Sequence, residues 1–182
     1  LRTMAPLMGD PGVSLWLVRG GYIILTMCVL FVQLMPISLT PAQWAPPDVM
    51  LAISLAWAQR RPGILPIWLV AGTFLLLDIM FQRPPGVWAA LGLLTIEWFK
   101  SRERQTTEVA FAVEWLSVAG SVVIMTLMYR GILLATALDA GPLHLATWQG
   151  ALTVALYPLV VLASHFIFGI RRTAPNETDL KS

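Results

Sequence analysis

Long apolar stretches with few charged residues between them constrain this chain more than any other feature. Six such stretches can be separated at glycine, proline and charged residues: 20–35, 49–58, 63–81, 85–99, 109–129 and 148–170. Hydrophobic residues make up 57% of the chain and charged residues 12%, against roughly 45–50% and about 25% in soluble domains. Such a chain has too little polar surface to cover a globule in water, so the sequence predicts an all-α integral membrane protein.

The lengths of the stretches predict how each one crosses the membrane. A ~30 Å hydrocarbon core needs roughly 20 helical residues, which the third, fifth and sixth stretches approach or exceed. Residues 49–58 would cover only about 15 Å. We therefore expect the second span to include residues 41–48 as a broken helix that is buried among its neighbours.

The predicted fold is a single domain, a bundle of six transmembrane helices with a short or broken second span. We expect the spans at about 20–35, 41–58, 63–81, 85–99, 109–129 and 148–170, and a disordered tail at 173–182. Residues 13–18 and 131–138 are expected to form short interfacial segments. Asp48 is expected to cap the second helix, and Pro62 and Pro85 to stand in first helical turns.

The basic residues predict the orientation of the bundle. If the chain crosses the membrane six times, ten of its twelve Lys and Arg residues fall on one side, and only Arg83 and Arg130 fall on the other. Positive charge accumulates on the cytoplasmic side of membrane proteins. We therefore expect a multi-pass protein of the cytoplasmic membrane with both termini inside. The arginines at 60, 61, 102 and 104 are interpreted as solvated charges beside the lipid, or as a contact with anionic lipid or a filament.

Asp78 is the most costly charge in the predicted spans. It lies about one turn before the outer end of the third span, where the helix dipole disfavours a carboxylate. We expect a salt bridge to Arg83 or Arg130 that joins two spans, with a proton or ligand site as the alternative.

Three further ionisable residues in the spans receive structural interpretations. Glu97 is expected to pair with Lys100 on its own helix. Glu114 is expected to pair with Arg60 or Arg61, with a contact to a partner protein as the alternative. His165 is interpreted as a packing residue.

The sequence contains no pattern that indicates an enzyme. It lacks phosphate-binding glycine loops, nucleophile elbows and paired metal ligands. Cys28 is the single cysteine, and the small net charge gives no reason to expect a nucleic acid. We expect no catalysis and no cofactor.

Several short motifs resemble a known family. They are Pro46-Pro-Asp-Val-Met-Leu-Ala-Ile-Ser-Leu-Ala-Trp-Ala-Gln-Arg-Arg-Pro-Gly63, Leu65-Pro-Ile-Trp68, Leu75-Leu-Leu-Asp-Ile-Met-Phe-Gln-Arg-Pro-Pro-Gly86 and Val113-Glu-Trp115. In these stretches the chain resembles the bacterial rod shape-determining membrane proteins of the MreD family. It departs from them at Gln82, where such proteins often have glycine before the Arg-Pro pair.

The resemblance implies a non-enzymatic scaffold of the elongasome, the machinery that inserts peptidoglycan along the side wall. Proteins of this family associate with MreC, and through it with RodA, a class B penicillin-binding protein and MreB. The residues to test by this resemblance are Asp48, Arg60, Arg61, Asp78 and Arg83. The family is also similar in fold to the substrate-binding subunits of energy-coupling-factor transporters, which gives the alternative function of a small-molecule-binding transport subunit.

Overall fold

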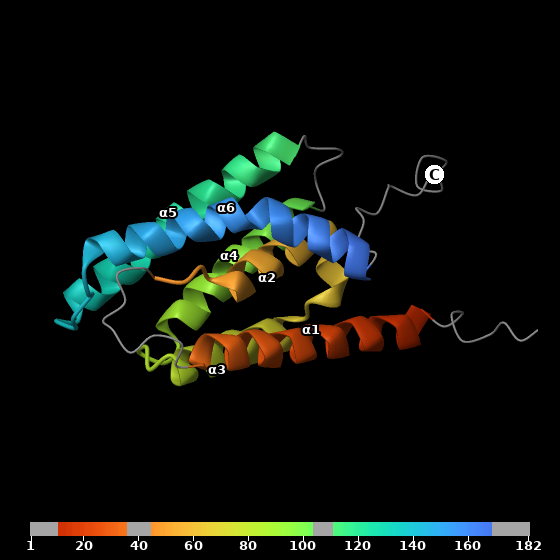
Figure 1. Ribbon diagram of the computed structural model, residues 1–182, viewed down its shortest axis with the longest axis horizontal. Coiled ribbons are helices and arrows are strands. Elements are labelled where there is room, and N and C mark those ends of the chain that lie inside the picture. The colour runs from red at the N-terminus through yellow and green to blue at the C-terminus, as the bar shows by residue number, and fades with distance from the viewer. Residues whose placement is uncertain (1–10, 36–44, 104–110, 169–182) are drawn as a thin grey trace, which may run out of the picture.

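The computed structural model describes residues 11–35, 45–103 and 111–168, and these ranges contain helices and turns but no strand. The elements are α1 (Pro11–Leu34), α2 (Val49–Arg60), the 3₁₀ turn η1 (Pro62–Ile64), α3 (Ile67–Met80), α4 (Val87–Glu103), α5 (Phe111–Ala135) and α6 (Leu143–Phe168). Helix α2 lies in the middle of the bundle and packs against α4 and α6, while α1 and α3 lie side by side at one edge (Figure 1). The prediction of an all-helical protein is confirmed.

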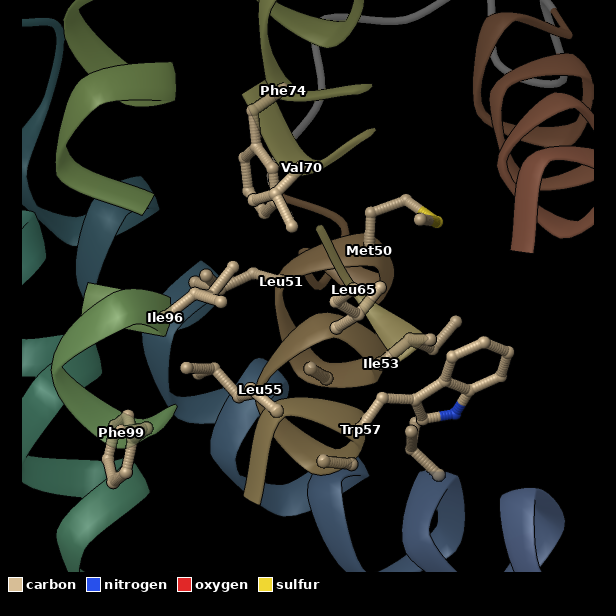
Figure 2. Packing of buried hydrophobic residues seen from close by; sticks show 14 of the residues in the cluster. Met50, Leu51, Ile53, Leu55, Trp57, Leu65, Val70, Phe74, Ile96 and Phe99 are labelled. Carbon is tan, nitrogen blue, oxygen red and sulfur yellow. The ribbon is translucent and has the colours of Figure 1, made fainter. Parts of the chain in front are cut away.

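The short helix α2 forms the centre of the hydrophobic core. Every residue from Met50 to Gln59 is buried, as expected for a helix that is apolar all round. Leu51 and Leu55 point toward Ile96 and Phe99 of α4 (Figure 2). The second apolar element is therefore shielded by protein, as its length predicts. The expected irregular part at residues 41–44 lies outside the described residues.

Helix α1 is joined to α2 by polar and aromatic contacts as well as by packing. The Tyr22 hydroxyl lies 2.7 Å from the Ser54 hydroxyl, and the Tyr22 and Trp57 ring centroids are 5.4 Å apart. The outer face of α1 is apolar and exposed; Phe31, for example, is 71% exposed. A surface of this kind is unfavourable in water and suited to lipid.

Three helices are long and apolar enough to cross a membrane among the residues that the structure describes. They are Leu15–Leu34 in α1, Phe111–Ala135 in α5 and Leu143–Phe166 in α6, and Ile67–Met80 is a shorter apolar helix. Most of their large side chains that face outward are apolar, including Leu116 (71% exposed) and Phe166 (76% exposed). The chain is a helical, multi-pass membrane protein.

Several predicted helix starts are wrong. Helix α1 begins at Pro11, nine residues before the expected start, so residues 13–18 belong to it and form no separate interfacial segment. The segment 63–66 lies in η1 and the turn after it, and α3 begins only at Ile67, after Pro66. Helix α6 begins at Leu143, before the expected residue 148.

The ends of two further helices also differ from the prediction. Helix α4 begins at Val87, just after Pro85, and continues to Glu103. Helix α5 extends to Ala135 and so includes residues 131–135 of the segment 131–138 that was expected to be interfacial. The predicted disordered tail at 173–182 lies outside the described residues.

Candidate functional site

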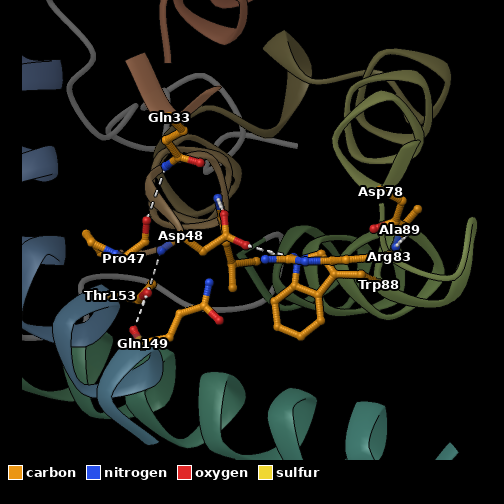
Figure 3. Close-up of polar contacts among 10 residues, drawn as sticks. Gln33, Pro47, Asp48, Asp78, Arg83, Trp88, Ala89, Gln149 and Thr153 are labelled. Atoms are coloured by element: carbon orange, nitrogen blue, oxygen red, sulfur yellow. Dashed lines mark hydrogen bonds and ion pairs between the residues drawn. The ribbon is translucent and has the colours of Figure 1, made fainter. Parts of the chain in front are cut away.

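A buried polar cluster lies at the end of the bundle that the charge distribution predicts to be outer. We call it the Asp48 cluster; it consists of Asp48, Arg83, Trp88 and Thr153 (Figure 3). Asp48 Oδ1 accepts a hydrogen bond from Leu51 N at 3.0 Å, which confirms Asp48 as the N-cap of α2. Asp48 Oδ2 accepts one from Trp88 Nε1 at 3.0 Å and lies 3.8 Å from Arg83 Nη1.

The cluster connects helices that are far apart in the sequence. The backbone N–H of Asp48 donates to Thr153 Oγ1 of α6 at 2.8 Å, while Trp88 belongs to α4. The Arg83 guanidinium carbon lies 5.2 Å from the centroid of the Trp88 ring and 5.3 Å from that of Phe81. Asp48 therefore connects α2 to α4 through its carboxylate and to α6 through its backbone amide. Aromatic rings flank the cation beside the carboxylate.

Asp78 caps a helix and does not form the predicted salt bridge. Its side chain is completely buried, and Oδ2 accepts hydrogen bonds from Gly86 N at 2.9 Å and Ala89 N at 3.1 Å. No ion pair joins it to a basic residue within the described part of the chain, so the prediction is wrong. Arg83 pairs with Asp48 instead, and Arg130 donates to carbonyl oxygens.

The turn between α3 and α4 explains this difference. Gln82 has φ 53° and Gly86 has φ 92°, a left-handed backbone that reverses the chain within a few residues. The reversal brings the free amides at the start of α4 onto the Asp78 carboxylate, where the positive end of the helix dipole also favours a negative charge. A backbone turn thus supplies the positive potential that was expected from an arginine.

We predict that Asp78→Ala destabilises the protein by about 1–3 kcal/mol, because it removes the acceptor of two amides at the start of a helix. Asp78→Asn should recover most of this loss, since asparagine also accepts such hydrogen bonds. Unfolding of the purified variants by sodium dodecyl sulfate in mixed micelles measures the stability change in each. Equal loss in the two variants would contradict a capping role and indicate that the charge itself is needed.

A cavity of about 220 Å³ lies beside the Asp48 cluster. Its wall combines charged, aromatic and polar side chains from four helices and from the turn before α6. The residues that carry hydrogen-bonding groups or charge are Asp48, Arg83, Trp88, Thr126, Tyr129, Arg130, Gln149 and Thr153. The cavity therefore brings polar groups from several helices close together.

A second buried polar cluster lies at the predicted cytoplasmic end. We call it the Glu114 cluster; it consists of Gln59, Arg60, Glu114 and Tyr157. Arg60 Nη2 lies 3.2 Å from Glu114 Oε1 and 3.3 Å from Oε2, and the Tyr157 hydroxyl donates to Oε1 at 2.6 Å. Gln59 Nε2 donates to the Tyr157 hydroxyl at 3.4 Å. The predicted pairing of Glu114 with an arginine of the second span is therefore found, and it joins α2, α5 and α6.

Two basic side chains hold the segment between α2 and α3 at the same end. Lys100 forms the predicted pair with Glu97, with Nζ 2.5 Å from Oε1, and it also donates to the carbonyl oxygen of Leu65. Arg19 donates to the carbonyl oxygens of Gly63 and Ile64, each at 3.2 Å. These contacts satisfy backbone groups that have no partner within a helix.

The remaining candidate residues lie apart from one another. Arg61 is exposed at the end of α2, whereas the Arg130 guanidinium donates to Ala140 O at 2.9 Å and Gly141 O at 3.0 Å. His165 lies half-buried near the end of α6, with its ring 5.5 Å from that of Phe166. No group of three histidine, cysteine or acidic residues gathers as metal ligands in the described ranges.

Sequence reasoning missed four polar residues that complete these clusters: Gln59, Trp88, Thr153 and Tyr157. Trp88 donates to Asp48 Oδ2, and Trp57 likewise donates to Ser164 Oγ, each at 3.0 Å. The available signal was a polar group within an apolar span. It marks a buried hydrogen bond but does not identify the partner.

The comparisons with known proteins add no relative to this picture. No protein-family model, no curated protein and no solved structure matches the chain.

Proposed function

We propose that this protein is a non-enzymatic membrane scaffold of the bacterial elongasome, similar to the MreD family. In this proposal it crosses the cytoplasmic membrane six times with both termini inside, binds MreC directly, and belongs to the same assembly as RodA, a class B penicillin-binding protein and MreB. It thereby supports side-wall peptidoglycan synthesis and rod shape.

One observation carries the proposal. The two sharpest stretches of the resemblance, 46–63 and 75–86, meet through the ion pair of Asp48 with Arg83. Asp48 and Asp78 both act as helix caps, which is a structural use of residues that an enzyme would present to a substrate. The motifs therefore build a rigid bundle, and a rigid bundle suits a protein whose role is to hold partners.

A groove between α1 and α3 is the surface that best suits the transmembrane helix of MreC. A partner helix cannot reach α2, because Met50–Gln59 is covered by protein, so the contact must be made by the outer faces of other helices. The groove has a volume of about 220 Å³ and is lined by Thr26, Met27, Trp68 and Gly72, among others. Small and hydroxyl-bearing residues favour close packing of helices in lipid.

We predict that Gly72→Leu reduces the recovery of MreC with the purified protein at least about tenfold, because the new side chain fills the groove and prevents close approach. Gly120→Leu is the matched control, since both glycines are exposed on helices and a Cβ at either would meet no atom within 4 Å. The measurement is quantitative mass spectrometry of proteins that co-purify from native membranes. Undiminished recovery of MreC with Gly72→Leu would exclude this groove as the binding surface. Absence of MreC from the preparation of the unmodified protein would argue against the scaffold function.

The alternative of a small-molecule-binding transport subunit is favoured by the polar cavity. The cavity contains several hydrogen-bonding groups close together, as a ligand pocket requires. Recovery of a stoichiometric soluble metabolite without MreC in the same preparation would support this function over the scaffold.

A further inference from the structure

The polar cavity beside the Asp48 cluster contains more positive than negative charge. Arg83 and Arg130 both line it, and Asp48 is the one carboxylate among its lining residues. Asp48 pairs with Arg83, whereas Arg130 donates only to the neutral carbonyls of Ala140 and Gly141. Asp139 in the same loop accepts from Gly141 N and is absent from the lining. One guanidinium charge in the cavity therefore has no acidic partner among the described residues.

Further hydrogen-bond donors face the same space. Tyr129 and Gln149 also line the cavity, and neither the Tyr129 hydroxyl nor the Gln149 side-chain amide makes a hydrogen bond to another described residue. Helix α6 begins at Leu143 beside them, so the positive end of its dipole adds to the potential. Arginine, tyrosine and amide donors around one chamber match an anionic group with several acceptor oxygens.

An apolar groove on the outside of the bundle adjoins the cavity. The groove lies between α5 and α6, has a volume of about 500 Å³ and is lined mainly by aliphatic and small side chains. The residues that line both spaces are Val122, Thr126, Arg130, Ala146 and Gly150. A charged chamber and a lipid-facing groove thus meet at Arg130.

We propose that the cavity binds the phosphate headgroup of an anionic membrane lipid, and that an acyl chain of this lipid lies in the groove between α5 and α6. The phosphate is an anionic partner for the Arg130 guanidinium, and it accepts hydrogen bonds from Tyr129 and Gln149. A soluble phosphate would leave the groove without a role, and a protein helix in the groove would leave the arginine charge unpaired. The inference goes beyond the proposed scaffold function and does not depend on it.

The test is native mass spectrometry of the full-length protein in detergent with equal amounts of phosphatidylglycerol and phosphatidylcholine of identical acyl chains. We expect the protein to retain phosphatidylglycerol at least about tenfold better. The phosphate is common to the two lipids, but the choline ammonium of phosphatidylcholine would add a positive charge beside Arg83 and Arg130, where like charges repel. Arg130→Gln should abolish the preference. Arg19→Gln is the control and should leave it unchanged, because Arg19 likewise donates to two backbone carbonyls but lies at the opposite end of the bundle. Equal retention of the two lipids by the unmodified protein would overturn the proposal.

A second variant separates a lipid from a soluble anion and does not disturb the loop that Arg130 holds. Ala151 lines the groove but not the cavity, so Ala151→Phe should reduce retention of phosphatidylglycerol about tenfold while binding of glycerol phosphate stays the same. If glycerol phosphate binds as tightly as the lipid and Ala151→Phe changes neither, the ligand is a soluble anion and the proposal is wrong. A photo-cross-linker at residue 151 that captures a protein in native membranes, and no lipid, would also overturn it.

Discussion

Replacing Asp48 with alanine is expected to destabilise the protein by about 3 kcal/mol, the sum of several losses at one carboxylate. The N-cap of α2 is worth about 1 kcal/mol, and a buried indole N–H without an acceptor costs about 1–3 kcal/mol. Trp88 Nε1 lies 3.0 Å from the carboxylate, and Asp48 is only 9% exposed, so water cannot readily replace the lost acceptor. Arg83 in addition loses the carboxylate 3.8 Å from its Nη1.

Unfolding by sodium dodecyl sulfate in mixed micelles measures this change, and two variants serve as controls. Asp48→Asn keeps one of the two acceptor oxygens, so it can preserve the cap to Leu51 N or the bond from Trp88 Nε1 but not both, and it should lose less stability than Asp48→Ala. Asp139→Ala removes an acidic residue that also accepts from a backbone amide, Gly141 N, but in an exposed loop, and should change stability little. A loss with Asp48→Ala no larger than with Asp139→Ala would show that the Asp48 cluster does not hold the bundle together.

The features that sequence reasoning predicted correctly depend on local spacing or on length. Asp48 follows two prolines and precedes an apolar run, so its role as a cap could be predicted from adjacent residues. Glu97 and Lys100 stand three residues apart on one helix. The burial of α2 followed from its length, because a helix too short to cross the hydrocarbon core must be covered by protein.

The features that it missed depend on the backbone path between helices. The partner of Asp78 is set by the left-handed residues Gln82 and Gly86, and a left-handed glutamine has no reliable sequence signal. Which side chain meets Asp48 likewise depends on how α4 and α6 pack, because Trp88 and Thr153 lie 40 and 105 residues away. Long-range pairs of this kind cannot be predicted from one sequence by spacing alone.

The start of α1 was missed for an energetic reason. The sequence analysis separated an interfacial segment at 13–18 from a first span at 20–35, yet α1 passes without a break through Arg19, Gly20 and Gly21. Each glycine weakens a helix by only about 1 kcal/mol. Arg19 also finds two carbonyl acceptors, Gly63 and Ile64, at the end of the bundle. The continuous helix therefore needs little compensation from its neighbours.

Glu114→Ala is expected to destabilise the protein by about 3–5 kcal/mol, because it leaves a largely buried arginine without its counter-ion. Glu114 is 3% exposed and accepts from both Arg60 and Tyr157, so one substitution removes contacts among α2, α5 and α6. Arg60 Nε is already buried without a hydrogen-bond partner in the described structure. The remaining charge on Arg60 would therefore depend on water entering the bundle.

The double variant Glu114→Leu with Arg60→Met distinguishes a structural pair from a contact with a partner protein. Apolar residues of similar size often replace a buried ion pair without loss, so this variant should recover more than half of the stability that Glu114→Ala loses. Stability is measured in mixed micelles, and MreC retention is measured in the same preparations. Recovery of both would assign the pair to the fold, since the bundle then needs the volume of the two side chains and not their charge. Recovered stability together with loss of MreC retention would instead place Glu114 and Arg60 in a partner interface. A double variant as unstable as Glu114→Ala would show that Tyr157 and Gln59 need the carboxylate themselves.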